Sequence, residues 1–221
     1  MTRPPLYGLD LLTEAPGFVR DVPGAGAGPG PDAEGATIVA VGLSLDGCER
    51  RFVGDETALL FDLDDFLAEL PPGVLTTWHG SITDLPVLAA RAVALHVPLG
   101  LRLRPDARVG LVPDGTAGPA APMWCGAWYD HRHLDLARVY SAPAARGFWS
   151  RRAGVPEDLI PPSDERTGHD PRHDAHLTRC LAERRWDRAR RLVDRMPPVP
   201  GAAPRLGSSP VGRATAAWSS A

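Results

Sequence analysis

The chain has 221 residues, of which 43% are hydrophobic, and a formal net charge of −3. This length suits one domain with some irregular chain, and the composition is sufficient for a buried core. The slightly acidic balance argues against non-specific coating of nucleic acid, so any contact with nucleic acid has to come from a local basic patch.

The three cysteines, Cys48, Cys125 and Cys180, lie far apart and form no CxxC pair. This spacing predicts reduced thiols in a cytosolic protein rather than a disulfide framework or a zinc knuckle. The N-terminal MTRPPLYGLDLL lacks the charged and apolar regions of a signal peptide, and no apolar run approaches the roughly 18 residues of a membrane span. We therefore expect a cytoplasmic protein that does not span a membrane.

The first half of the chain is predicted to alternate strands and helices. Its expected elements are a strand at 5–12, a Gly- and Pro-rich loop at 23–35, a hairpin at 36–53, a helix at 55–70, a strand at 74–78 and a helix at 84–95. The hairpin is predicted because Asp46-Gly47 separates two strand-like runs. Both helices are predicted from apolar residues that recur with a helical period.

The second half is predicted as a long loop at 98–128, a strand at 134–139, a short helix at 142–153, a loop at 156–168 and a long helix at 170–195. Residues 197–221 are low in large apolar side chains and are expected to be disordered. We therefore predict a single domain at 1–196. The order of elements favours an α/β fold with a mixed sheet, antiparallel at the front and parallel behind, flanked by helices.

Carboxylates stand at several of the expected element ends. Asp10 lies in an apolar strand, where a buried carboxylate needs a cation, a metal or strong donors. Asp84 opens a helix, for which the alternative role is a simple N-cap. His169 and Asp174 stand at the start of the last helix and would, on their own, suit a solvated helix start.

Three acidic segments brought to one end of a sheet can hold Mg²⁺ or Mn²⁺, because these ions prefer oxygen ligands. Two such ions about 4 Å apart can activate a water and stabilise the leaving oxygen of a phosphodiester. A histidine beside that water can remove its proton, since the histidine pKa lies near neutral.

Three segments resemble the exonuclease motifs of the DEDD superfamily, which includes polymerase proofreading exonucleases. YGLDLLTE resembles the first motif, normally Asp-x-Glu on the first strand, and TWHGSITDLPVLAARA resembles the second, a Trp-Asn-Gly-type loop that continues as a helix. GHDPRHDAHLTRCLAERRW resembles the third motif in its variant with His five residues before Asp. The resemblance follows the family's order from residue 5 to residue 190 and implies a ribonuclease H-like fold.

This resemblance implies a metal-dependent 3′→5′ exonuclease that acts on the 3′ ends of single-stranded DNA or RNA with two Mg²⁺ or Mn²⁺ ions. Asp10 would bridge the two ions, and Asp84 would support the second ion through water. Asp174 would ligate the first ion, and His169 would be the general base. The 3′→5′ direction is implied by the family alone.

The sequence departs from the family pattern in two places. The family's Glu position falls on Leu12, which cannot ligate a metal. Glu14 points to the same face but lies about 6.6 Å further along a strand, so it can replace the missing ligand only where the strand bulges or ends. His79 and Thr83 stand where the family has Asn and Phe, which alters the predicted contacts to the substrate terminus.

Further substrate contacts are expected from the loop 98–128 and from Arg151 and Arg152. The last helix is also basic, because it carries Arg184, Arg185, Arg188, Arg190 and Arg191. These arginines either form a solvated face with partners such as Glu183 and Asp187, or bind phosphate if they face the metal site.

Two other functions remain open from the sequence. The first is a catalytically inactive ribonuclease H-like module that binds nucleic acid or a protein, which Leu12 supports. The second is a zinc hydrolase, because residues 131–135 (HRHLD) match the start of the HxHxDH pattern of metallo-β-lactamase-like enzymes. The next residue, however, is Leu136 instead of His.

Overall fold

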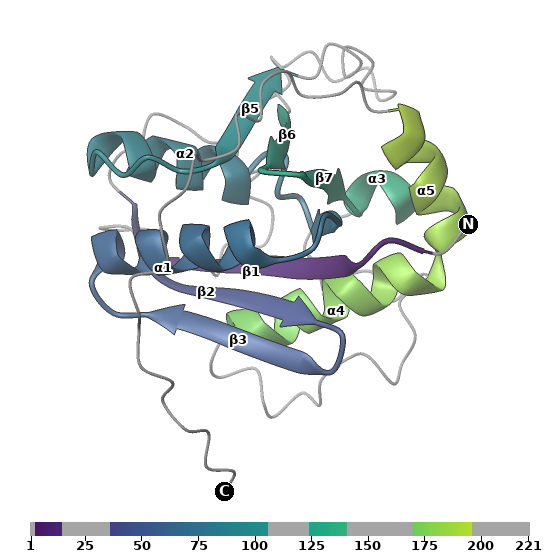
Figure 1. Cartoon of the computed structure of the whole chain (residues 1–221), viewed down its shortest axis with the longest axis horizontal. Helices are drawn as coiled ribbons and strands as arrows, with labels where there is room; N and C mark the ends of the chain where they lie inside the picture. The colour runs from purple at the N-terminus through teal and green to yellow at the C-terminus, as the bar shows by residue number, and fades with distance from the viewer. Residues whose placement is uncertain (1–2, 15–35, 106–123, 141–169, 196–221) are drawn as a thin grey trace, which may run out of the picture.

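The computed structural model describes residues 3–14, 36–105, 124–140 and 170–195. Their elements are, in chain order, β1 (Leu6–Glu14), β2 (Thr37–Leu45), β3 (Cys48–Val53), α1 (Glu56–Glu69), β4 (Val74–Thr77), α2 (Asp84–Ala94), β5 (Leu101–Pro105), β6 (Trp124–Trp128), β7 (His131–Asp135), α3 (Ala137–Tyr140), α4 (Pro171–Arg184) and α5 (Trp186–Arg195). Within these ranges seven strands form one sheet, flanked by helices (Figure 1). The predicted α/β class is therefore confirmed.

The sheet is mixed, with the strand order β3-β2-β1-β4-β7-β6-β5. β1 pairs with β4 and β4 pairs with β7 in parallel, whereas the outer neighbours pair antiparallel. The carboxyl ends of the three parallel strands consequently share one edge of the sheet, which is where ligands bind in many α/β folds. A meander beside a parallel centre is consistent with the ribonuclease H-like fold that the sequence resemblance implies.

The hairpin expected at 36–53 is present as β2 and β3. Leu45 pairs with Cys48, so the turn consists of the two residues Asp46 and Gly47. Gly47 has a φ of 71°, a left-handed conformation that glycine adopts without steric cost. The local Asp-Gly signal therefore predicted both the turn and the register of this pair.

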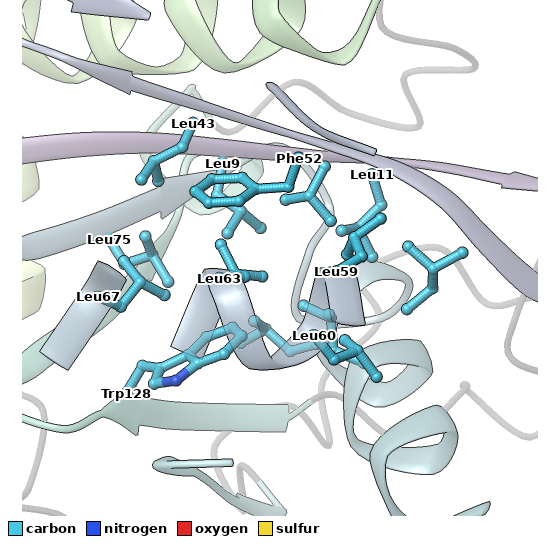
Figure 2. Close-up of a cluster of buried hydrophobic side chains, with 14 of the residues drawn as sticks. Leu9, Leu11, Leu43, Phe52, Leu59, Leu60, Leu63, Leu67, Leu75 and Trp128 are labelled. Carbon is cyan, nitrogen blue, oxygen red and sulfur yellow. The ribbon is translucent and has the colours of Figure 1, made fainter. Parts of the chain in front are cut away.

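Two apolar clusters fill the two faces of the sheet. The larger cluster contains Leu9, Leu43 and Leu75 from the sheet together with Leu63 from α1 and Trp128 from β6. Figure 2 shows these side chains meeting between the sheet and α1. The smaller cluster lies on the opposite face, where α4 and α5 pack against β4, β7 and α3. Each strand of the centre is thus buried on both sides.

Helix α1 begins where the sequence predicts, because Asp55 caps it by accepting from the backbone N–H of Thr57 at 3.0 Å. The helix also carries a buried carboxylate, Asp64, at 1% exposure. Asp64 Oδ1 accepts from Trp128 Nε1 at 2.7 Å, and Asp64 Oδ2 accepts from the hydroxyl of Tyr129 at 2.5 Å. These bonds attach α1 to the end of β6.

The region 98–128 was expected to be a loop, but its described parts form the antiparallel strands β5 and β6. The alternation of Leu101, Arg102, Leu103 and Arg104 is a strand signal, because the two leucines pack on the larger core cluster while the arginines point the other way. The segment is short and flanked by proline and glycine, so its two-residue alternation was too brief to predict a strand. Tertiary pairing with β6 completes the strand.

Two other boundaries differ from the predictions. The strand expected at 134–139 is β7 and starts earlier, and the chain turns helical after it because Asp135 accepts from the backbone N–H of Ala137 at 3.0 Å. The single helix expected at 170–195 is split at Arg185, whose φ of −116° and ψ of 32° are not helical. The break lets Ala189 pack on the smaller cluster.

The predicted loop at 23–35, the short helix at 142–153 and the tail at 197–221 lie outside the described residues, and the domain limit at 196 stays a prediction. Across the described part of the chain, every helix is too short or too polar to cross a bilayer.

Candidate active site

Asp10 lies on the face of β1 that α4 covers. Side chains alternate along a strand, and the buried Leu9 and Leu11 belong to the core beneath α1. Asp10 therefore points to the opposite face, where it is half-buried and paired across from Gly42 of β2. At this depth the carboxylate is partly desolvated yet still accessible to a ligand.

Glycines allow the first turns of α4 to lie directly on β1 and β2. A Cβ at Gly42 would overlap the backbone of the first residue of α4, and a Cβ at Gly8 would overlap the carbonyl oxygen of Ala175. Because Gly42 pairs with Asp10, α4 starts over the strand position that carries this carboxylate. Asp174 belongs to the same first turn and is half-buried. The fold thus brings two of the predicted residues to one face.

Asp84 follows the loop that connects β4 to α2. It is buried at the start of α2, and the hydroxyl of Thr83 donates to Asp84 Oδ1 at 2.9 Å. Thr83, and not Asp84, occupies the N-cap position, so Asp84 is not a simple capping residue. The same hydroxyl lies 3.1 Å from the carbonyl oxygen of His79. Because β1 and β4 are parallel neighbours, this loop leaves the sheet at the edge towards which Asp10 also lies.

Asp135 holds this loop, a role that the sequence analysis missed. Its carboxylate is 1% exposed and accepts from the backbone N–H of His79 at 3.0 Å and of Ser81 at 3.2 Å. From the other side, the carbonyl oxygen of Ser81 accepts from the N–H of Trp124 at 2.9 Å. His79 has a φ of 60°, which is uncommon outside glycine. The available sequence signal was an aspartate between two apolar residues, Leu134 and Leu136.

We expect Asp135→Asn to destabilise the protein by about 3 kcal/mol, because hydrogen bonds to a charged acceptor contribute about 1.5–3 kcal/mol each. The amide nitrogen of Asn would place a donor against the N–H of Ser81. Amide hydrogen exchange should then accelerate at His79 and Ser81. In the matched variant Asp64→Asn, which also alters a buried carboxylate, exchange at these two amides should stay protected. Equal exchange in both variants would show that Asp135 does not hold the loop.

Leu12 lies on the same face of β1 as Asp10 and is half-buried. The pairing of β1 with β2 shifts register after Leu12, but the extra residue is Val39 of β2, so β1 itself has no bulge. Glu14 ends β1 as an exposed residue and remains about 6.6 Å beyond Leu12. Because β1 neither bulges nor ends between Leu12 and Glu14, the strand keeps Glu14 at this distance from the missing ligand position, and its role as a ligand stays a prediction.

The remaining predicted residues His169, Arg151 and Arg152 lie outside the described residues. Within the four described ranges, no group of three or more His, Cys, Asp or Glu side chains is arranged so that it could hold a metal ion. Asp10, Asp84 and Asp174 come to one edge of the sheet without making up such a group by themselves.

The two histidines of the HRHLD segment contact different protein atoms, and their ring nitrogens are not directed at a common metal position. His131 Nε2 lies 2.8 Å from the carbonyl oxygen of Leu67, and His133 Nε2 lies 2.8 Å from Thr77 Oγ1. Burial lowers the pKa of both rings, for His133 to about 4, so they are neutral at pH 7. These contacts speak against the zinc-hydrolase alternative.

The arginines of the last helices lie away from this edge. α4 starts over Gly42, while Glu183 near its end lies 3.2 Å from Arg3, which precedes β1. α4 therefore runs antiparallel to β1, and α5 follows beyond its far end, beside the N-terminus (Figure 1). These arginines therefore do not face the predicted metal site, which was the condition for binding phosphate there.

No family model matches the chain, and no curated protein matches it significantly. Among solved structures, the chain is similar to a family B DNA polymerase from the hyperthermophilic archaeon Pyrobaculum calidifontis, with 19% sequence identity and a TM-score of 0.47. The match covers 87% of this chain and 24% of the polymerase, so the chain spans about a quarter of that protein's length. The function is therefore inferred from the site residues and not from this likeness.

Proposed function

We propose that this protein is a metal-dependent 3′→5′ exonuclease acting on single-stranded DNA or RNA, with a centre weakened by Leu12. The observation that supports the proposal is that Asp10, Asp84 and Asp174 are half-buried or buried carboxylates near the carboxyl ends of the parallel strands. They come from β1, from the start of α2 and from the start of α4, far apart in sequence. Carboxylates that are withdrawn from water in this way favour a cation-dependent activity, because a cation offsets the cost of their desolvation.

The donor chemistry of these residues fits Mg²⁺ or Mn²⁺, because all three offer carboxylate oxygens. Asp10 of β1 and Asp174 of α4, which lie on the same face of the sheet, would hold one ion, and Asp84 would support a second. When bound, the ions would supply Lewis acidity and charge stabilisation at the phosphodiester. His169 would accept the proton of the attacking water.

His79 and Thr83 would contact the substrate terminus from the loop that Asp135 holds. Since this loop is attached on both sides, it would present its groups without a large cost in conformational entropy. The proposed metal centre lacks one ligand, because the apolar side chain of Leu12 stands where the family has a carboxylate.

A second candidate function is a catalytically inactive ribonuclease H-like module that binds nucleic acid or a protein. Two observations favour it: Leu12 replaces a ligand, and the described residues contain no group of three that could hold a metal ion. This module would keep the fold and the binding surface while lacking hydrolysis.

The deciding assay follows the length of single-stranded DNA and RNA labelled at the 5′ or the 3′ end, with Mn²⁺, with Mg²⁺ or with EDTA. The exonuclease is expected to shorten the 5′-labelled strands stepwise and to release the 3′ label early, only with metal. Absence of metal-dependent shortening in the natural protein would reject it in favour of the inactive module.

Leu12→Glu should raise the rate of Mn²⁺-dependent shortening at least about tenfold, since altered metal coordination changes activity by about 10–100-fold. The physical reason is a restored carboxylate on the face that Asp10 shares. Leu12→Gln, which has the same length without the charge, is the matched control and should raise the rate little. A Glu variant no faster than the Gln variant would show that Leu12 does not occupy a ligand position.

A further inference from the structure

The last two helices contain a strongly basic stretch. Residues 184–195 include six arginines and two aspartates, a formal charge of +4, in a chain whose net charge is −3. Charge gathered in this way creates a local positive potential that the overall balance hides. The stretch lies at the end of the molecule opposite the carboxylate edge, so the proposed hydrolysis does not use it.

Helix α5 is firmly docked on the fold. Ala189 and Val193 are buried in the smaller core cluster. Arg132 of β7 donates from Nη1 to the carbonyl oxygen of Val193 at 3.3 Å, and the guanidinium of Arg185 lies 4.3 Å from the ring centroid of Tyr140. These contacts hold the helix in one orientation, so its outward face is preorganised.

Three arginines follow the outward face of α5: Arg188, Arg191 and Arg195, here called the α5 arginine stripe. All three are exposed, and their i, i+3, i+7 spacing places them on one side of the helix. Along the axis they span about 10 Å, which corresponds to about three phosphates at the 3.4 Å spacing of a stacked strand. Arg191 Nε donates to the carbonyl oxygen of Asp187 at 3.2 Å, and Arg190 pairs with Asp194 at 3.4 Å.

We propose that the α5 arginine stripe is a docking surface for the phosphate backbone of a nucleic acid, separate from the carboxylate edge. The choice of a nucleic acid as the occupant rests on the proposed function. α4, with 14 residues, separates the two sites by about 21 Å. The stripe would hold a strand at a distance from the end that is hydrolysed.

The composition of the outward face favours a phosphate backbone over an acidic protein. The large apolar residues of α5, Trp186, Leu192 and Val193, all pack on the smaller core cluster, so the outward face consists of arginines bordered by aspartates. In protein interfaces, arginine anchors act together with buried aromatic and apolar side chains, and on α5 these side chains are turned towards the core. Phosphate backbones, by contrast, are bound by arginine and lysine charge with release of counterions.

The test measures fluorescence anisotropy of a 5′-fluorescein 20-nucleotide single strand, as DNA and as RNA, with the full chain in EDTA at 50–200 mM salt. EDTA prevents metal-dependent hydrolysis, so binding is measured whether or not the exonuclease proposal holds. The triple variant Arg188→Gln, Arg191→Gln, Arg195→Gln should weaken binding at least about tenfold at the lowest salt. It should also flatten the slope of log K against log salt by about 2, because each phosphate contact to a single strand contributes about 0.7.

Two control variants separate charge from folding. The triple Lys variant at the same positions should bind within about twofold of the natural protein, because lysine also binds phosphate as a point charge. Asp187→Asn with Asp194→Asn should tighten binding, since it removes the bordering negative charges. A Gln variant that binds like the natural protein overturns the proposal. So does a natural protein that binds polyglutamate but neither oligonucleotide, which would instead indicate an acidic protein partner.

Discussion

Replacing Asp174 by Asn is expected to reduce the Mn²⁺-dependent shortening of a single strand by more than about 100-fold, because even changes to the outer partners of metal ligands cost about 10–100-fold. Asp174 lies in the first turn of α4, on the face of the sheet that carries Asp10. Asn keeps the size of the side chain and one oxygen but removes the charge that would hold the cation. The loss should therefore appear without unfolding.

The matched control is Asp62→Asn, which removes an exposed carboxylate from α1 on the other side of the sheet. Its rate should stay within about twofold of the natural protein, as for surface substitutions away from a site. In isothermal titration calorimetry, Asp174→Asn should bind Mn²⁺ more weakly than the natural protein, whereas Asp62→Asn should bind it equally well. If both variants shorten the strand at the natural rate, Asp174 is not part of a metal centre and the exonuclease proposal fails.

Gly42→Ala is expected to lower the free energy of unfolding by about 3 kcal/mol or more, at the upper end of the cost of overpacking. A Cβ at this position would overlap backbone atoms of Pro171 and Arg172, which cannot move as the end of a flexible side chain can. The first turn of α4 would have to lift from β2, and with it Asp174. Urea denaturation measures the loss, and hydrogen exchange in α4 shows where it acts.

Gly47→Ala serves as the comparison, because a Cβ there meets no atom within 4 Å although its φ is 71°. It should cost only the strain of a left-handed alanine, about 1–2 kcal/mol, and leave exchange in α4 unchanged. If both variants lose the same free energy of unfolding and neither changes hydrogen exchange in α4, then α4 does not pack closely on Gly42.

The parts of the fold predicted well from the sequence are those with a strong local cause. The hairpin β2–β3 follows from Asp46-Gly47 between β-branched runs, and α1 follows from its capping Asp55 and its apolar period. In both, the chemistry that decides the conformation lies within a few residues. Such elements need little help from distant parts of the chain.

The elements that were missed depend on distant partners. β5 has a short Leu-Arg alternation that becomes a strand because β6 pairs with it. The break at Arg185 separates α4 from α5 so that Ala189 reaches the core formed with β7 and α3. No local rule sets where a helix has to bend to remain in contact with a sheet.

The candidate site divides in the same way. Asp10 was recognisable as a carboxylate inside an apolar strand, and Asp84 and Asp174 because each stands at the start of a helix, all three within segments that resemble a known motif. Asp135 was overlooked as a positioning residue because its partners are backbone N–H groups of His79 and Ser81, which carry no signature in the sequence. Only the folded chain shows which backbone donors a buried carboxylate meets.

By itself, the sequence determined which residue types are available for chemistry and the α/β class, since periodicity and turn signals are local properties. Tertiary structure decided three further points: α4 lies on Gly8 and Gly42 beside Asp10, the bulge falls in β2 and leaves Leu12 in place, and the arginines of α5 face away from the carboxylate edge. The physical reason is that each depends on close packing between segments distant in the chain, where one missing Cβ or one extra residue changes which groups can meet.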